Sequence, residues 1–313
     1  MEYCADDGTL KTLIEVLIAE TDSGTSYASD PEMIRKTNTT VSEDSFKVIQ
    51  TWLDMCERNQ CAAPHPPDAP LPTRLIEVRQ YPRLVTSDTL ARDAPYIALS
   101  HCWGLKPIFS LRQANLADLS GKIPVEKLPK TFRDAMHIAM RLGIKYLWID
   151  SLCIIQDSTD DWLHEASRMQ SVYSYCWLNL AATGFPDGSA GMIARRDKWH
   201  VSAWYGITGD YWRDDLERAP MNQRAWVLQE RLLSPRTLHF GTKQIFWECR
   251  QGSGSEYQPN PAMMLVASIG SPVVGVKGKF WGTFTDSQEW TERYIGQWGE
   301  LVSWYNQLHL TKE

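Results

Sequence analysis

Polar and aromatic side chains follow an apolar run in the stretch "YIALSHCWG", residues 96–104. The apolar start predicts a buried strand, and Gly104 ends it. In an open α/β sheet, the residues just past the carboxyl end of a strand line the ligand crevice. The residues placed there are Ser100, His101, Cys102 and Trp103. The stretch therefore predicts half of an active site or, as the alternative, a well-packed strand end.

A second polar residue, Asp150, ends the apolar run "YLWI". A buried charge without a partner is costly, so this carboxylate needs a cation, hydrogen-bond donors or water. One interpretation is a binding or catalytic carboxylate at the strand ends. The other is a structural acid that caps the turn at Ser151–Leu152 or pairs with an arginine. The residue pattern leaves both open.

Glu165 lies in a predicted helix, about 60° from the seam that the helix turns toward the core. The seam residues, at 4-3-4-3 spacing, are Trp162, Ala166, Met169, Tyr173 and Cys176. From its position, the Glu165 carboxylate can look across the strand ends toward Asp150 and Ser100. In sugar-transfer chemistry such a carboxylate stabilises an oxocarbenium-like transition state. The alternative is an ion pair with Arg168, which would stabilise the helix by only about 0.2–0.5 kcal/mol.

Two other chemistries fit the sequence less well. Neighbouring strand residues point to opposite faces of a sheet, so His101 and Cys102 do not form a simple imidazole–thiol pair. The candidate zinc ligands are spaced more widely than the paired ligands of zinc fingers. These candidates are Cys4, Cys56, Cys61 and His65. We therefore expect neither a cysteine nucleophile nor a metal site.

The predicted helix in "NQRAWVLQERLL" carries polar residues among apolar ones. Gln229 and Glu230 cannot both face the core, so at least one faces a cleft or solvent. A structural clamp that holds this helix on the sheet explains the polar residues, and a ligand contact is the alternative. No glycine-rich phosphate loop of known spacing is present. Contacts to an anionic ligand would therefore come from arginines, with Arg195, Arg196 and Arg224 as candidates.

Strand and helix patterns alternate between these residues, which is typical of parallel strands joined by crossover helices. The sequence predicts an α/β fold with a central, mostly parallel sheet flanked by helices. "TRLIEVRQ" is interpreted as the first strand, at a possible edge of the sheet. We divide the chain into an N-terminal helical segment with a proline-rich connector (1–72), the α/β domain (73–250), and a loop-rich and helical C-terminal extension (251–313).

The composition is that of an acidic globular protein, with 313 residues, a formal net charge of -6 and a pI near 5.7. A nucleic-acid binder would usually be basic. The start "MEYCADDGTL" lacks the features of a signal peptide, and no apolar run approaches the ~20 residues of a membrane helix. Seven cysteines at irregular spacing indicate reduced thiols. We therefore expect a cytoplasmic protein without membrane or nucleic-acid partners.

Three blocks of the sequence resemble the fungal heterokaryon-incompatibility (HET) domain in their order and spacing. They are "YIALSHCWG", "IKYLWIDSLCIIQDSTDDWLHEASRMQSVY" and "RAWVLQERLLSPRTLHFG". The last two blocks are long and specific, and the resemblance covers roughly residues 95–240. It implies a role in fungal self/non-self recognition, in which the domain triggers or executes programmed cell death. The partners it implies are further copies of the chain or partner incompatibility proteins. In such proteins a further helix continues past "LVSWYNQLHLTKE", which implies that the chain is truncated or a minimal member.

The HET domain also resembles Toll/interleukin-receptor (TIR) domains, which have a flavodoxin-like sheet and in some members hydrolyse NAD with a glutamate. Here the resemblance rests on the strand that ends in Ser100 and Cys102, and on Trp162 followed by Glu165. It implies NAD or another nucleotide as the ligand, with no other cofactor. The implied catalytic residues are Glu165, Asp150 and Ser100, and the implied ligand-binding residues are His101, Cys102, Trp103, Asp161, Trp162 and Arg224.

Two other functions remain open. The first is a non-catalytic module that acts by self-association through exposed aromatic residues. Candidates for that interface are Trp204, Tyr205, Trp212 and Trp298. The second is a repurposed biosynthetic transferase, because the acids Asp160, Asp161 and Glu165 resemble a short acidic motif of some fungal cyclodipeptide-forming enzymes.

Overall fold

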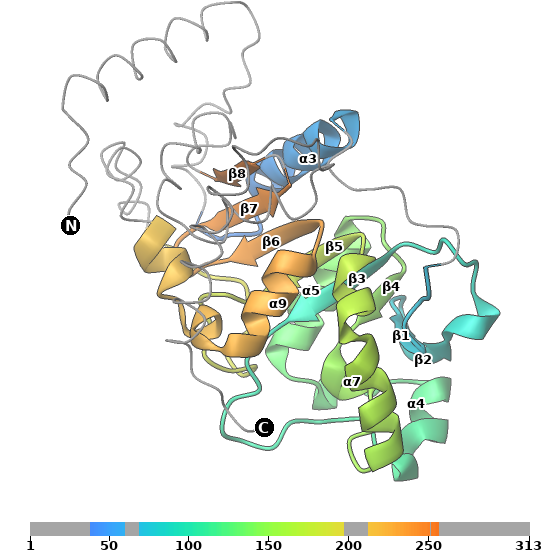
Figure 1. The fold of residues 1–313 in the computed structure, drawn as a ribbon. Coiled ribbons are helices and arrows are strands. Elements are labelled where there is room, and N and C mark those ends of the chain that lie inside the picture. Colours follow the sequence, from blue (N-terminus) through green and yellow to red (C-terminus); the bar gives the residue numbers. More distant parts are fainter. Residues whose placement is uncertain (1–37, 60–68, 197–211, 251, 257–313) are drawn as a thin grey trace, which may run out of the picture.

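One sheet of eight strands runs through the part of the chain that the computed structural model describes, which is residues 38–59, 69–196, 212–250 and 252–256 (Figure 1). The strand order is β2-β1-β4-β3-β5-β6-β7-β8. The strands are β1 (Arg74–Glu77), β2 (Arg83–Thr86), β3 (Tyr96–Ser100), β4 (Tyr146–Trp148), β5 (Leu178–Ala181), β6 (Arg236–Phe240), β7 (Ile245–Cys249) and β8 (Gly252–Ser255).

The sheet is mixed, so the prediction of a mostly parallel sheet is only partly confirmed. The pairs β3–β4, β3–β5 and β5–β6 are parallel and form the centre. The flanking pairs β1–β2, β1–β4, β6–β7 and β7–β8 are antiparallel. Three of these pairs are joined by short connections, and such a hairpin can only give antiparallel strands. The edge strand beside β1 is β2, so the first predicted strand is not at the edge.

Six α-helices accompany the sheet in the described residues: α3 (Glu43–Arg58), α4 (Leu116–Gly121), α5 (Lys130–Arg141), α6 (Asp150–Cys153), α7 (Thr159–Ser174) and α9 (Ala225–Leu233). Figure 1 shows α7 and α9 in front of the sheet and α5 behind it. The side chains of β3 and of the residue after it agree, because the Tyr96 hydroxyl donates to the Val172 carbonyl of α7 while the His101 ring packs edge-on against Phe132 of α5. The fold is therefore of the α/β class, with helices on both faces.

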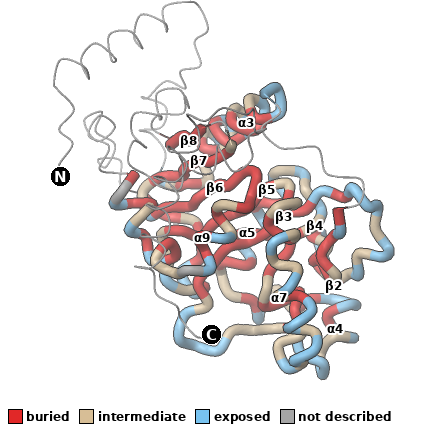
Figure 2. Tube along the Cα trace, viewed as in Figure 1, coloured by how far each residue is buried: buried red, intermediate tan, exposed pale blue. Residues whose placement is uncertain are grey.

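The helix α3 packs against β7 and β8, at the edge of the sheet opposite β2. Its Trp52 ring stacks on Trp247 of β7 with the ring centroids 5.9 Å apart. A Cβ atom at Gly254 of β8 would lie 2.9 Å from Nε1 of Trp52. Glycine at this position therefore lets the edge strand approach the indole. Figure 2 shows buried residues both in α3 and in the strands of the sheet.

The predicted seam of α7 is correct only in its second half. Tyr173 and Cys176 are buried, but Trp162 is 52% exposed. The first two turns of α7 instead present Asp161 and Glu165 to Arg74 of β1, which turns the indole outward. No helix in the described residues is long and apolar enough to cross a membrane.

Candidate functional site at the switch point of the sheet

The chain leaves the carboxyl ends of β3 and β5 in opposite directions. After β3 it passes to α5 behind the sheet, and after β5 it passes to α9 in front. The two departing segments meet, because a Cβ atom at Gly104, whose φ is 76°, would lie 2.6 Å from Cβ of Asp187. Such a reversal of strand order is the switch point at which open α/β sheets bind ligands. Polar groups between β3 and β5 are therefore the first place to look for function.

Eight side chains gather here and are called the switch-point cluster: Ser100, His101, Cys102, Trp103, Asp150, Tyr173, Arg224 and Glu230.

Glu230 of α9 is a carboxyl of the switch-point cluster whose pKa is raised. Burial, reinforced by the negative charge of Asp150, raises its pKa to about 7, although Ser100, Arg224 and Tyr173 act in the opposite direction. Its Oε2 atom is buried and accepts no hydrogen bond. A carboxyl that titrates near neutral pH exchanges protons readily with a substrate or water.

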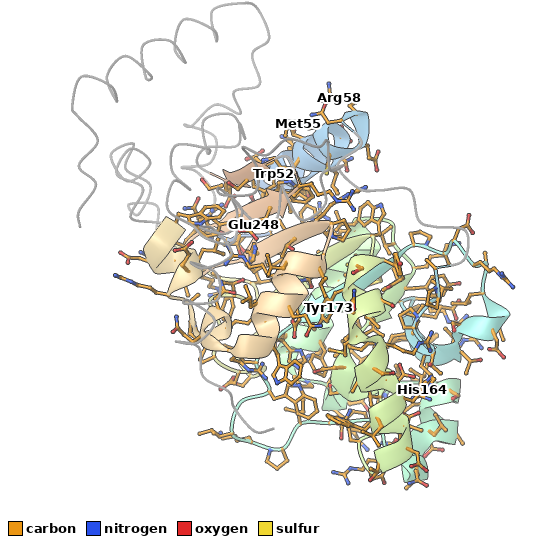
Figure 3. All side chains as sticks on the ribbon, viewed as in Figure 1. Trp52, Met55, Arg58, His164, Tyr173 and Glu248 are labelled. Carbon is orange, nitrogen blue, oxygen red and sulfur yellow. The ribbon has the colours of Figure 1, made fainter. Side chains whose placement is uncertain are left out.

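Two hydroxyls adjoin the Glu230 carboxyl. Ser100, at the end of β3, donates from Oγ to Oδ1 of Asn179 on β5 at 3.1 Å. Tyr173 comes from α7, and Figure 3 shows it between α7 and α9. Burial and the neighbouring Glu230 and Asp150 raise the pKa of the Tyr173 hydroxyl well above its usual value. The phenol therefore remains protonated and available as a hydrogen-bond donor.

Asp150 joins the ends of β3 and β4. Its Oδ2 accepts from Nε1 of Trp103 at 2.7 Å, and its Oδ1 accepts from the backbone N–H of Ser151 at 2.6 Å. Asp150 thus bonds to the backbone of its own turn without capping α6, whose N-cap is Ile149, and the acid also lies inside the switch-point cluster. The Nδ1 atom of His101 is 3.8 Å from Asp150 Oδ1. Burial lowers the pKa of this histidine, so the imidazole is neutral at neutral pH.

Arg224 and Cys102 complete the cluster. Nη1 of Arg224, the residue before α9, donates to the His101 carbonyl at 2.9 Å and so ties α9 to the segment after β3. The Cys102 side chain packs with Ala181, Met221 and Val227. Burial raises the pKa of its thiol despite the opposing charge of Arg224. A thiol with a raised pKa is a poor nucleophile, which agrees with the expectation from the sequence.

Glu165 and Asp161 lie in a different group of contacts, around Arg74 of β1. Nη2 of Arg74 donates to both carboxylate oxygens of Asp161, at 2.6 and 2.5 Å. Glu165 is 1% exposed, and its Oε1 is 4.0 Å from the same Nη2 and 3.9 Å from Nε2 of His164. Neither oxygen of Glu165 accepts a hydrogen bond among the described residues. The structure therefore brings Ser100 and Asp150 together but turns Glu165 toward β1.

The alternative interpretation of Glu165, an ion pair with Arg168, is wrong, because this pair does not form. Arg168 donates instead to the Thr73 hydroxyl and the Leu71 carbonyl, both at 2.8 Å. These acceptors belong to the segment that leads into β1, which draws the guanidinium away from its own helix.

A comparison with protein families matched residues 96–230 to the family described as heterokaryon incompatibility protein (HET). The chain carries a HET domain. The matched segment begins at Tyr96, the first residue of β3, and ends at Glu230 of α9. It therefore contains every member of the switch-point cluster. No curated protein and no solved structure gave a match.

The HET domain is attached to the rest of the sheet by a buried ion pair just beyond the matched segment. Arg231 donates from Nε to Oε2 of Glu248 on β7 at 2.7 Å and from Nη2 to Oε1. His239 Nε2 lies 3.1 Å from the same Oε2, and His239 Nδ1 lies 2.9 Å from the Thr183 hydroxyl. This is the structural clamp that the polar residues of the helix predicted.

Three arginines were predicted as contacts for an anionic ligand, and the structure separates them. Arg196 forms a buried ion pair with Glu256, with Nη1 2.6 Å from Oε2, so it does not face a ligand. Arg195 is exposed and pairs through its backbone with Thr39. Of the three, only Arg224 belongs to the switch-point cluster of the HET domain.

The self-association residues predicted from the sequence are not supported where they can be checked. Trp212 is 2% exposed and packs edge-on against Phe246 with centroids 5.5 Å apart, so it is a core residue. Trp204, Tyr205 and Trp298 lie outside the described residues, as do Cys4, Cys61 and His65. Cys56 is buried in α3. In the ranges that the structure describes, no His, Cys, Asp and Glu side chains are grouped to hold a metal ion.

Glu230 is the residue that sequence reasoning did not place in the site. Glu230 and Arg231 are neighbours on α9, where side chains point about 100° apart. Arg231 turns toward β7 and Glu230 toward β3. The sequence held one signal for this, the adjacent acid and base Glu230 and Arg231 on a largely apolar helix. If both charges are buried, they point in different directions and need partners on different strands.

Proposed function

We propose that this HET domain takes part in fungal self/non-self recognition, triggers or executes programmed cell death, and does so by binding and hydrolysing NAD. The family match supports the incompatibility role. The observation that carries the chemical part is the Glu230 carboxyl, whose pKa of about 7 places it between its two protonation states at neutral pH. This assignment moves the acid of the site from Glu165 to Glu230.

The proposed reaction breaks the bond between the nicotinamide nitrogen and the ribose. Nicotinamide leaves with the electron pair of that bond, and a water molecule adds its oxygen to the anomeric carbon. The ionised Glu230 carboxylate accepts the proton that the water loses. The products are nicotinamide, ADP-ribose and one proton, which Glu230 passes to solvent.

The other members of the switch-point cluster hold the reacting groups. Ser100 and Tyr173 carry hydroxyls that adjoin Glu230 and can bind the water or a ribose hydroxyl. The Asp150 carboxylate, fixed by Trp103 and the Ser151 N–H, supplies negative charge near a ribosyl cation. A fixed charge costs no reorganisation when the transition state forms.

The test is NAD consumption by the purified full chain, with and without a crowding agent, followed by chromatography of nicotinamide. Glu230→Gln keeps the shape of the side chain but cannot accept the proton. Since general acid–base groups contribute roughly 10²–10⁴-fold, this change should lower turnover at least a hundredfold. Glu126→Gln, at an exposed acid before α5, is the matched control and should have normal turnover.

Glu165→Gln decides between the two carboxyls. On the proposed site it lowers turnover much less than Glu230→Gln. A hundredfold loss in Glu165→Gln with normal turnover in Glu230→Gln would make Glu165, beside Arg74, the catalytic carboxyl instead. No turnover by the wild-type chain under any of these conditions would remove NAD hydrolysis from the proposal.

A non-catalytic, self-associating module is the second candidate, because two neighbouring apolar residues on α7 are exposed. Trp162 is 52% and Leu163 is 57% exposed. If this pair forms the contact, Trp162→Ala with Leu163→Ala should abolish both oligomers in light scattering and cell killing, while Glu230→Gln leaves killing intact. The transferase alternative has no such support, since Asp161 is bonded to Arg74 and Glu165 is buried.

A further inference from the structure

Trp226 is a large aromatic residue that the fold leaves in solvent. It is 57% exposed although it lies in the first turn of α9, a helix whose other side packs on the sheet. An indole contributes to stability mainly when it is buried. Its exposure therefore calls for an explanation other than packing.

The position of Trp226 on α9 places it beside the proposed acid. Residues four apart on a helix lie on the same face, about 5–6 Å apart at Cβ. Trp226 and Glu230 have this spacing. Because helical side chains lean toward the N-terminus, the Glu230 side chain leans toward the turn that carries Trp226.

The same end of α9 is anchored at the switch point. Arg224, two residues before Trp226, donates to the His101 carbonyl after β3. The first turn of α9 is thereby held next to the carboxyl end of β3. An exposed ring on this turn therefore lies on the same helix face as Glu230, whose Oε2 atom is buried and accepts no hydrogen bond from the described residues.

We propose that Trp226 is the stacking platform for an aromatic heterocycle of the ligand, one carried on a ribose phosphate. This inference rests on the proposed function and deepens it. An exposed indole face offers a flat apolar surface, and heterocyclic bases stack on such surfaces with little dependence on their identity. The pyridinium of a nicotinamide nucleotide, or the adenine at the other end of a dinucleotide, has the required ring.

A matched residue exists at the opposite end of the parallel strands. Tyr81 is also 57% exposed and lies in the turn between β1 and β2, at the amino ends of the central parallel strands. It has the same exposure as Trp226 but is remote from the switch-point cluster. Tyr81→Ala therefore controls for the loss of an exposed aromatic ring.

The experiment measures binding of nicotinamide mononucleotide and of adenosine monophosphate to the full chain by saturation-transfer NMR and titration. Wild type and Tyr81→Ala should bind at least one of the two probes equally well. Trp226→Ala should weaken that binding about tenfold or more, which corresponds to about 1.4 kcal/mol. Trp226→Phe keeps a flat ring and should recover most of the affinity. The probe that depends on Trp226 identifies the stacked ring.

Several results would overturn the proposal that Trp226 stacks on the ligand. Equal affinity of Trp226→Ala and wild type would do so, as would failure of the wild-type chain to bind either probe. A third is a dimer in light scattering that Trp226→Ala dissociates while nucleotide binding is unchanged, because the ring would then be a contact between copies. NAD turnover in the Glu230→Gln test judges the hydrolase independently, so failure of one proposal is distinguishable from failure of the other.

Discussion

Glu230 of α9 and Glu248 of β7 are two buried carboxyls, and their pKa values are shifted in opposite directions. Glu248 of β7 accepts two hydrogen bonds from Arg231 and lies beside His239, and these partners hold its pKa well below the usual range. For Glu230, the neighbouring hydroxyls and the charge of Arg224 also lower the pKa, but burial outweighs them and raises it to about 7. Burial alone would raise the pKa of both. The partner, and not the depth, decides whether a buried carboxyl is a fixed charge or a proton acceptor.

This contrast separates the structural and chemical work of α9. The Arg231–Glu248 pair fixes the helix on β7, and the next residue back then faces β3. Because Arg231 and His239 lower the pKa of Glu248, this carboxylate stays ionised and does not exchange protons near neutral pH. The Glu230 carboxyl retains a buried oxygen without a hydrogen-bond donor among the described residues. This oxygen can accept a hydrogen bond from a substrate or water.

The largest expected effect comes from breaking the fixed pair. Glu248→Gln leaves Arg231 buried without its counter-charge, so the free energy of unfolding should fall by about 3–5 kcal/mol at neutral pH. Denaturant unfolding measures this loss. Glu57→Gln, at an acid that is exposed and 3.9 Å from Arg236, should change stability by no more than about 0.5 kcal/mol. A loss below 1 kcal/mol in Glu248→Gln would contradict the clamp.

An intermediate effect is expected at Glu230, and it depends on pH. The pKa of this carboxyl is raised in the folded protein from an ordinary value of 4.5 to about 7. The folded state therefore binds more protons than the unfolded state between these values, and stability falls as pH rises through that window. Glu230→Gln cannot ionise and should lack the fall. At pH 8 it should be more stable than wild type by at most about 3 kcal/mol.

Unfolding curves between about pH 4 and 8 measure this difference. Parallel stability profiles for wild type and Glu230→Gln would show that the carboxyl titrates normally. Glu126→Gln, at an exposed acid, should follow the wild-type profile.

The smallest effect concerns the hydroxyl beside Glu230. The Tyr173 hydroxyl lowers the pKa of Glu230 by hydrogen bonding, against the larger effect of burial. Tyr173→Phe removes a hydrogen bond worth about 0.5–1.5 kcal/mol, so the midpoint of the stability decline should move upward by no more than about one pH unit. A downward movement would mean that Tyr173 does not donate to this carboxyl. Tyr146→Phe, at a half-buried tyrosine of β4, should leave the midpoint unchanged.

The sequence predicted the elements whose signal is local. Apolar runs marked β3 and β4, and the residue patterns of α7 and α9 predicted helices. The strand β8 has the sequence "GSGS" and carries no apolar signal. Its place in the sheet depends on Trp52, which requires the glycine at 254, and that contact joins residues two hundred positions apart.

The candidate site was predictable to a similar degree. Ser100, His101, Cys102, Trp103 and Asp150 could be placed at strand ends because strand ends follow from the apolar pattern. The directions of Glu165 and Glu230 could not. Each is set by a cation on a different element, Arg74 of β1 for the first and the Arg231–Glu248 pair for the second, and helical periodicity does not encode those partners.

The central claim is that Glu230 is a carboxyl that exchanges its proton near neutral pH. A pH titration of the side-chain carboxyl carbons, in protein labelled with carbon-13 at the glutamate carboxyls, tests it directly, and Glu230→Gln assigns the signal by its absence. The account predicts a midpoint of about 7 for Glu230 and no titration of Glu248 above the ordinary range of a glutamate. A midpoint for Glu230 near its ordinary value of 4.5 would contradict the account.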